Sequence, residues 1–122
     1  MSWTDYIKNL TNTGHVDKAA IVGPNGSIWA ASNGWNITSS EITNIVCNWP
    51  NFSSSGIKLA GTKFMFIRGD DHVVLGRDKA TGICIGKTKQ AFVIGFHNDK
   101  QYIGNCNKEV QKIVDYLTEQ GY

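Results

Sequence analysis

Four short apolar segments, separated by only a few residues, place the strongest constraint on the fold of this chain. They span residues 61–69, 72–77, 82–88 and 90–98, and each has the composition typical of a β-strand. Connections this short cannot carry the chain across a sheet to a parallel neighbour, so consecutive segments must pair as hairpins. The second half of the chain therefore predicts an antiparallel meander.

A further pair of strands is predicted nearer the N-terminus. Residues 16–23 and 27–32 have strand composition and flank Pro-Asn-Gly at 24–26, a common turn sequence. These segments predict a hairpin. Residues 50–56, which are rich in serine and asparagine, predict a loop or a short helical turn.

Three other segments have apolar residues at helical spacing. The first helix is expected to follow Ser2 or Thr4, either of which can cap a helix N-terminus. The second is expected to follow Thr38 or Ser39 for the same reason, and the third lies within 105–122. Helices and strands in this order predict one α+β domain over residues 1–122, with helices on both faces of a mainly antiparallel sheet.

The composition of the chain excludes several classes of protein. Hydrophobic residues make up 41% of its 122 residues, which suffices for one ordinary core and is too high for a disordered chain. No apolar run approaches the roughly 18 residues of a membrane span, and no signal peptide is evident, so the cytosol or nucleus is the expected location. The odd number and wide spacing of Cys47, Cys84 and Cys106 favour reduced thiols that pack as small hydrophobes.

Basic residues are concentrated in one part of the chain, although the formal net charge is only +2. Residues 58–89 contain seven basic side chains against three acidic ones. A basic surface of this kind suits an acidic partner, whose approach it accelerates more than it strengthens the final complex. An acidic protein surface or a phosphoinositide headgroup is therefore the expected partner of this region.

Aromatic residues occur near both ends of the chain, where isolated side chains would be exposed to water. If the first and last helices lie side by side, five rings can gather into one half-exposed surface: Trp3, Tyr6, Trp29, Tyr116 and Tyr122. Flat aromatic grooves with a few hydrogen-bond donors suit proline-rich segments, because proline rings stack between aromatic rings. The alternative for Trp3 is ordinary core packing beside Ile7 and Leu10.

No pattern in the sequence indicates an enzyme. His15, His72 and His97 have no cysteine, serine or carboxylate partner at a recognised spacing, and the glycines do not match a phosphate-binding loop. No catalytic residue, metal ion or cofactor is expected. Two alternatives of other classes stay open: a single-stranded nucleic-acid-binding module, and a small hydrolase built on Cys106 or His97.

Several motifs together make the chain resemble the profilin family over nearly its full length. "SWTDYI" is followed by "AAIVGPNGSIWAAS", and the likeness continues through "LAGTKFMFIRGDD", "TGICIGKTKQAFVIGFHN" and "GNCNKEVQKIVDYLTEQGY". The length is that of the shorter, plant- and protist-like members. The resemblance implies a central, mostly antiparallel sheet of about six to seven strands. It also implies that the N- and C-terminal helices share one face of the sheet and that shorter helices cover the other.

The resemblance implies two binding sites. Residues that match the polyproline groove of the family are Trp3, Tyr6, Asn9, Trp29, Tyr116, Leu117 and Tyr122. Residues that match its actin-binding face are Lys63, Arg68, Arg77, Lys79, Thr88, Lys89, Gly104, Asn107, Lys108 and Lys112. Tyr116 stands where many animal members have a histidine. The serines within 52–57 stand where some members carry larger apolar residues, which implies weaker actin binding than in those members.

On this resemblance the chain is expected to be a non-enzymatic regulator of actin polymerisation in the cytoplasm, at the actin-rich cell cortex. It would bind monomeric actin at one face and proline-rich proteins such as formins at the other, and so deliver actin to polymerisation factors. Phosphatidylinositol 4,5-bisphosphate is a further expected ligand, held by basic residues that overlap both sites.

Overall fold

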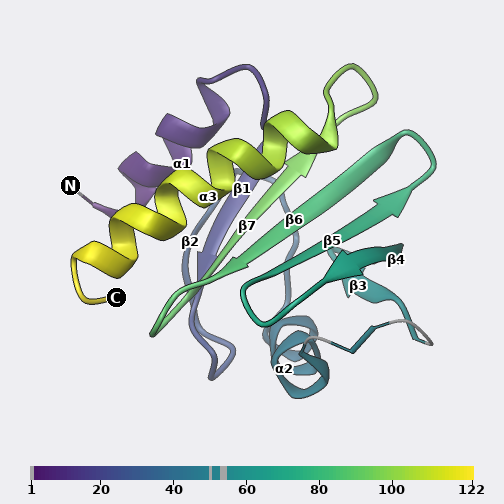
Figure 1. Ribbon diagram of the computed structural model, residues 1–122, viewed down its shortest axis with the longest axis horizontal. Helices are drawn as coiled ribbons and strands as arrows, with labels where there is room; N and C mark the ends of the chain where they lie inside the picture. The colour runs from purple at the N-terminus through teal and green to yellow at the C-terminus, as the bar shows by residue number, and fades with distance from the viewer. Residues whose placement is uncertain (1, 50, 53–54) are drawn as a thin grey trace.

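Seven strands form one antiparallel sheet, and three helices pack against its faces, in the part of the chain that the structure describes (Figure 1). This computed structural model describes residues 2–49, 51–52 and 55–122. The strands are β1 (Lys18–Val22), β2 (Ile28–Ala31), β3 (Ile57–Leu59), β4 (Thr62–Gly69), β5 (Val73–Asp78), β6 (Thr81–Lys87) and β7 (Phe92–His97). The helices are α1 (Trp3–Thr11), α2 (Ser39–Asn48) and α3 (Ile103–Glu119).

The predicted meander is confirmed. The strand order across the sheet is β2-β1-β7-β6-β5-β4-β3, so β4 to β7 pair in succession and β1 joins the free edge of β7. β3 escaped prediction because it has only three residues and directly follows the segment 50–56, for which a loop or helical turn was expected. Residues 50, 53 and 54 of that segment lie outside the described residues.

The two faces of the sheet bury separate apolar clusters. On one face α1 contacts β1 and β2, and α3 contacts β6 and β7, chiefly through buried residues such as Leu10 and Val110. On the opposite face α2 packs through Ile42 and Ile45 (Figure 1). The shared face of the terminal helices is therefore confirmed. Where the resemblance implied several shorter helices, the described residues form one, α2.

Two capping boxes determine where the first two helices begin. The Ser2 hydroxyl accepts the Asp5 backbone N–H at 3.3 Å, and the Asp5 carboxylate accepts the Ser2 N–H at 3.0 Å. Thr38 and Glu41 repeat this arrangement at the start of α2, with distances of 3.3 and 3.0 Å. Each pair satisfies two backbone donors that a helix N-terminus leaves without partners. Ser2 and Thr38 are therefore the caps.

Glu41 also ties α2 to the hairpin between β3 and β4. Its carboxylate accepts the N–H groups of Ala60 at 3.0 Å and Gly61 at 2.9 Å. Both turn residues have a positive φ, 52° and 80°, which suits a two-residue hairpin turn but is strained for alanine. Burial acts to raise the pKa of Glu41, but the donors from Gly61, Thr38 and Ala60 lower it below its ordinary value. The carboxylate therefore stays charged at neutral pH and holds the strained turn.

The three cysteines are free thiols in different surroundings. Cys84 on β6 and Cys106 on α3 are buried in the cluster beneath α3, as the sequence predicted. The neighbouring Cys106 thiol, together with burial, raises the pKa of Cys84 above its usual range. The expectation that Cys47 packs in the core is wrong: it is exposed, because α2 turns Ile42 and Ile45 toward the sheet instead.

Candidate functional site

Five aromatic side chains form a continuous row, here called the aromatic groove: Trp3 and Tyr6 on α1, Trp29 on β2, Tyr116 on α3, and Tyr122 beyond α3. The centre of the Trp3 ring lies 4.8 Å from that of Trp29 and 5.0 Å from that of Tyr122. Tyr6 extends the row, 5.7 Å from Trp3 and 5.9 Å from Tyr116. Tilted and edge-to-face pairs at such spacings attract one another. The rings that were expected to gather therefore lie together.

The packing of α1 beside α3 explains this row. The apolar stripe of α1 faces the sheet, so Trp3 on this stripe meets Trp29 of β2, while Tyr6 on the flank meets Tyr116 of α3. Tyr116 and Tyr122 remain 43% and 41% exposed, so the row is open to a ligand. Leu117, which the resemblance assigned to the groove, is fully buried in the cluster against which the rings pack. Its contribution to the groove is support from beneath.

Hydrogen-bond donors border the groove. Asn9 is exposed on α1, one turn beyond Tyr6. Desolvation, followed by contact with the Tyr116 hydroxyl, raises the pKa of the Tyr6 phenol, which therefore remains a donor at neutral pH. The Trp29 indole N–H already donates to Ser27 Oγ at 3.2 Å. Tyr6 and Asn9 thus offer hydrogen-bond donors beside the row of rings.

Gln90 is a groove residue that the sequence did not indicate. It lies in the turn between β6 and β7 and lines an open hollow of about 390 Å³ together with Trp3, Trp29 and Tyr122. Its backbone N–H donates to the Tyr122 carbonyl oxygen, and its side-chain amide donates to the Gly121 carbonyl oxygen at 3.2 Å. No local pattern signals this position, because the contact joins a hairpin to a distant segment.

Four basic side chains form a second surface, here called the basic sheet face: Lys63 and Arg68 on β4, Arg77 on β5, and Lys79 in the following turn. α3 chiefly covers β6 and β7, so the same side of β4 and β5 is open to solvent (Figure 1). Lys63, Arg77 and Lys79 line one hollow of about 430 Å³. Arg77 also lines a second hollow, of about 480 Å³, that reaches the start of α3. Arg77 is therefore the centre of this surface.

Exposed apolar side chains, which were not predicted from the sequence, surround Arg77. Met65 is 74% exposed and lines the first hollow, while Tyr102 is 73% exposed and lines the second beside Ile67, which is 48% exposed. The alternation along β4 was a usable signal, because a strand that buries Phe64 must turn Met65 to the other side. The surface thus combines cations with large apolar groups.

Three further residues that match the actin-binding face lie in the first turns of α3: Gly104, Asn107 and Lys108. Gly104 and Lys108 are exposed, and apart from the adjoining backbone of α3 no heavy atom lies within 4 Å of the position that a Cβ of Gly104 would occupy. The Asn107 Oδ1 atom is buried without a hydrogen-bond partner among the described residues. Because α3 starts at the second hollow, these residues lie at the edge of the basic sheet face.

Thr88 and Lys89 lie apart from the other residues of this set. Both belong to the turn between β6 and β7, whereas Lys79 lies at the opposite end of β6. Lys89 is exposed, but Thr88 is only 6% exposed. The Thr88 hydroxyl donates to the Tyr122 carbonyl oxygen at 2.8 Å. The turn is therefore next to the aromatic groove.

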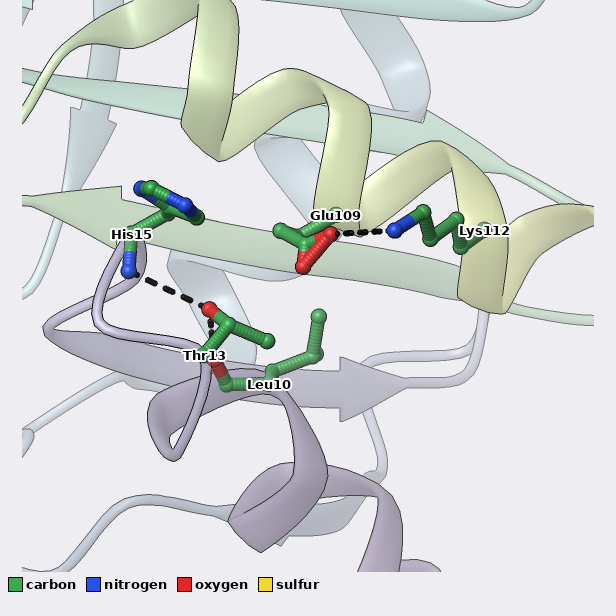
Figure 2. Close-up of polar contacts among 5 residues, drawn as sticks. All are labelled: Leu10, Thr13, His15, Glu109 and Lys112. Atoms are coloured by element: carbon green, nitrogen blue, oxygen red, sulfur yellow. Dashed lines mark hydrogen bonds and ion pairs between the residues drawn. The ribbon is translucent and has the colours of Figure 1, made fainter.

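Lys112 lies on the side of α3 that faces α1 (Figure 2). Its Nζ atom lies 2.8 Å from the carboxylate of Glu109, which is 8% exposed. Both residues line a hollow of about 260 Å³ with Asn9 and Thr13 of the N-terminal segment. Figure 2 also shows Thr13, whose hydroxyl donates to the Leu10 carbonyl oxygen at 2.8 Å at the end of α1.

Side chains able to serve catalysis are scattered. His97 is buried in β7, with Nδ1 3.0 Å from the Asn98 carbonyl oxygen, and Cys106 is buried beside Cys84. Among the described residues, no three His, Cys, Asp or Glu side chains are placed to hold a metal ion. This geometry does not favour the hydrolase alternative. Within the same residues, no helix has the length and apolar character needed to cross a membrane.

Comparisons with known proteins give a consistent likeness over the full length. The family model described as Profilin matches residues 1–122. Profilin-2 of Acanthamoeba castellanii is 37% identical over 126 residues, with 100% of both chains covered. The structure of Acanthamoeba castellanii profilin IB superimposes with a TM-score of 0.94 at 33% identity, over 99% of this chain and 100% of that one. Mouse profilin IIa, in complex with a double repeat from the FH1 domain of mDia1, gives a TM-score of 0.84 at 26% identity, with 100% of both chains covered.

Proposed function

Because this chain belongs to the profilin family, whose members are non-enzymatic actin-binding proteins, we propose that it binds monomeric actin and proline-rich segments at separate surfaces. The aromatic groove is the proposed site for proline-rich segments. The basic sheet face, with the first turns of α3, is the proposed site for actin. The protein would thereby bring actin monomers to polymerisation factors that carry proline-rich tracts.

The row of touching rings is the observation that carries this proposal. A polyproline II helix has no internal hydrogen bonds, so its rings are free to stack and its carbonyl oxygens are free to accept. The groove offers spaces between rings, such as those on either side of Trp3, and donors at Tyr6 and Asn9. The related mouse protein in complex with FH1 repeats supports this class of ligand.

The composition of the basic sheet face supports a protein as its partner. Protein interfaces are enriched in arginine, methionine and tyrosine, and Arg77, Met65 and Tyr102 lie together here. Exposed cations around these residues would steer an acidic partner such as actin toward the surface. A purely electrostatic site would not expose such large apolar side chains at its centre.

The placement of the two surfaces supports simultaneous binding. The aromatic groove lies at the C-terminal end of α3, whereas the basic sheet face adjoins its N-terminal end (Figure 1). A short proline-rich peptide in the groove would leave the sheet face uncovered. The aromatic rings and the cations thus lie on separate surfaces. This separation argues against a site for single-stranded nucleic acid, because in such sites aromatic and basic side chains alternate on one surface.

Two finer parts of the proposal concern lipid and location. The exposed cations Lys63, Arg77 and Lys79 around one hollow suit the phosphates of phosphatidylinositol 4,5-bisphosphate. Lipid and actin would then compete for the basic sheet face. A protein that binds both would concentrate in the cytoplasm at the actin-rich cell cortex.

One experiment tests the two sites together. The protein is loaded on immobilised poly-L-proline, and actin monomers are then passed over the resin. We expect the protein to be retained and to retain actin in turn, with both released by free poly-L-proline. Failure of the protein to bind the resin would contradict the proposed groove. Retention of the protein without actin would contradict either the proposed actin site or simultaneous binding.

A further inference from the structure

The turn between β6 and β7 is bonded to the segment that carries Tyr122. The Thr88 hydroxyl donates to the Tyr122 carbonyl oxygen at 2.8 Å, and the Gln90 N–H donates to the same oxygen. The Gln90 side-chain amide donates to the Gly121 carbonyl oxygen at 3.2 Å. In Figure 1 this turn reaches the end of the molecule at which both chain termini lie. The residues after α3 are therefore attached to the sheet as well as to the helix.

We propose that this turn is the third wall of the aromatic groove and that Thr88 is a positioning residue for Tyr122. The inference rests on the proposed function, because the groove must bind a proline-rich ligand for the position of Tyr122 to matter. In this arrangement α1 and α3 supply two walls of the groove. The hairpin turn sets how closely Tyr122 approaches Trp3.

The bonds of the Thr88 hydroxyl explain why this residue is suited to the task. Besides donating to Tyr122, the hydroxyl accepts the Ala91 N–H at 2.9 Å, so it is anchored to the strand that follows the turn. The side chain is only 6% exposed, which protects both bonds from competing water. The position of the Tyr122 backbone is thus set by the sheet. Its ring is thereby held 5.0 Å from Trp3 and 6.5 Å from Trp29.

The same geometry gives Thr88 a different role from the one that the resemblance implied. A side chain that is buried, with its hydroxyl bonded on both sides, has little surface to offer to actin. Gln90, two residues further on, is exposed and lines the hollow between Trp29 and Tyr122. Its amide is therefore placed to contact a ligand directly, while Thr88 acts through Tyr122.

The test compares two variants. Thr88→Val keeps the shape of the side chain and removes the hydroxyl, whereas Thr88→Ser retains the hydroxyl and removes the methyl group. Affinity for a proline decamer is measured by titration calorimetry on the full chain. Loss of one net hydrogen bond predicts binding about five- to tenfold weaker for Thr88→Val and near wild type for Thr88→Ser. Thr81→Val is the matched control, because Thr81 also sits beside a hairpin turn and donates to Asp78 O at 2.8 Å, far from the groove.

Two further measurements separate positioning from general loss of structure. The near-ultraviolet circular dichroism of the unliganded aromatic cluster should change in Thr88→Val and recover in Thr88→Ser. Gln90→Ala leaves the Thr88 bonds in place and should weaken decamer binding about two- to fivefold, so the proposal stays testable even if Thr88→Val unfolds.

Several outcomes would overturn the inference. Wild-type affinity in Thr88→Val and Gln90→Ala would show that the turn is not a wall of the groove. If Thr88→Val weakened actin binding and left decamer binding unchanged, Thr88 would belong to the actin-binding site and not to the groove. Failure of Thr88→Ser to recover binding would exclude the hydroxyl as the cause. If the wild-type protein did not bind the decamer, this result would contradict both the proposed function of the groove and this inference.

Discussion

In the aromatic groove every ring lies against another ring, whereas the cations of the basic sheet face are exposed to solvent around an open hollow. The ion pair found among the described residues joins Lys112 and Glu109, and it lies on the flank of α3 that faces α1 and not on the basic sheet face. Contacts between partly desolvated rings are stronger than those of exposed charges, which water and salt screen. The groove should therefore fail when one ring is lost, while the sheet face should weaken in small steps.

The largest effect is expected from Trp3→Ala. Trp3 touches three other rings, so its removal opens the centre of the groove. Loss of one central aromatic residue typically costs on the order of 2 kcal/mol of binding free energy, or about 30-fold in affinity. Titration with a proline decamer measures this loss.

Trp35→Ala is the matched control for Trp3→Ala. Trp35 is also half-buried, but it packs near Phe96 against the apolar cluster on the other side of the sheet. It should lower the thermal midpoint and leave decamer affinity unchanged. Equal losses of affinity in the two variants would mean that stability, and not the row of rings, controls binding.

The next effect concerns a buried charge that supports the edge of the basic sheet face. Glu41→Gln removes the charge that holds the strained turn at Ala60 and Gly61 against α2. We expect the free energy of unfolding at neutral pH to fall by about 1.5 kcal/mol, the value of a hydrogen bond to a charged group. Glu119→Gln, a change at an exposed carboxylate on α3, serves as control.

The pH dependence of this effect follows from the lowered pKa of Glu41. A carboxyl group whose pKa is lowered by folding contributes its full stabilisation above its ordinary pKa of 4.5. The contribution is lost as the pH falls through the lower pKa of the folded state. Urea unfolding of wild type and Glu41→Gln should therefore converge at acidic pH. A constant difference at all pH values would exclude the carboxylate charge as the cause.

Smaller effects are expected on the basic sheet face. Lys79→Glu and Lys108→Glu should each weaken binding of actin monomers by about 1 kcal/mol or less, and less still at high salt. Polyproline binding should stay at the wild-type level. Lys8→Glu makes the same change in charge on α1 and is the control. An unchanged actin affinity in the double reversal would remove this face from consideration.

The smallest effect is expected from Lys112→Met. The pair with Glu109 spans one turn of α3, and Lys112 is 65% exposed, so its contribution is that of a helical surface pair. The free energy of unfolding should fall by about 0.5 kcal/mol or less, and the difference should vanish in high salt. A larger loss would show that burial of Glu109 makes this pair stronger than the exposed charges of the sheet face.

Local patterns predicted most of the fold. The caps at Ser2 and Thr38 and the meander from β4 to β7 all leave signals within a few residues of chain. The gathering of rings was predictable from the flanks of two helices. Strand β3 was not predictable, because three residues between a turn and a loop are too few to show an alternation of apolar and polar side chains.

Contacts between distant segments explain the remaining gaps. The hydrogen bond from Thr88 to Tyr122 forms because the turn between β6 and β7 lies next to the end of α3. The residues near Thr88 or Tyr122 in the sequence do not indicate this contact. Gln90 was missed for the same reason. Met65 differs from these two residues, because the alternation of buried and exposed residues along β4 is a local signal of its exposure.

The contact between Trp3 and Tyr122 spans almost the whole chain and has a consequence for biosynthesis. Trp3 is synthesised long before Tyr122, so the contact between their rings cannot form until residue 122 has been added. Closing so long a loop costs entropy, which places this contact late in folding. A nascent or truncated chain therefore lacks one wall of the groove. A ligand that needs the Tyr122 ring would distinguish chains that contain Tyr122 from chains truncated before it.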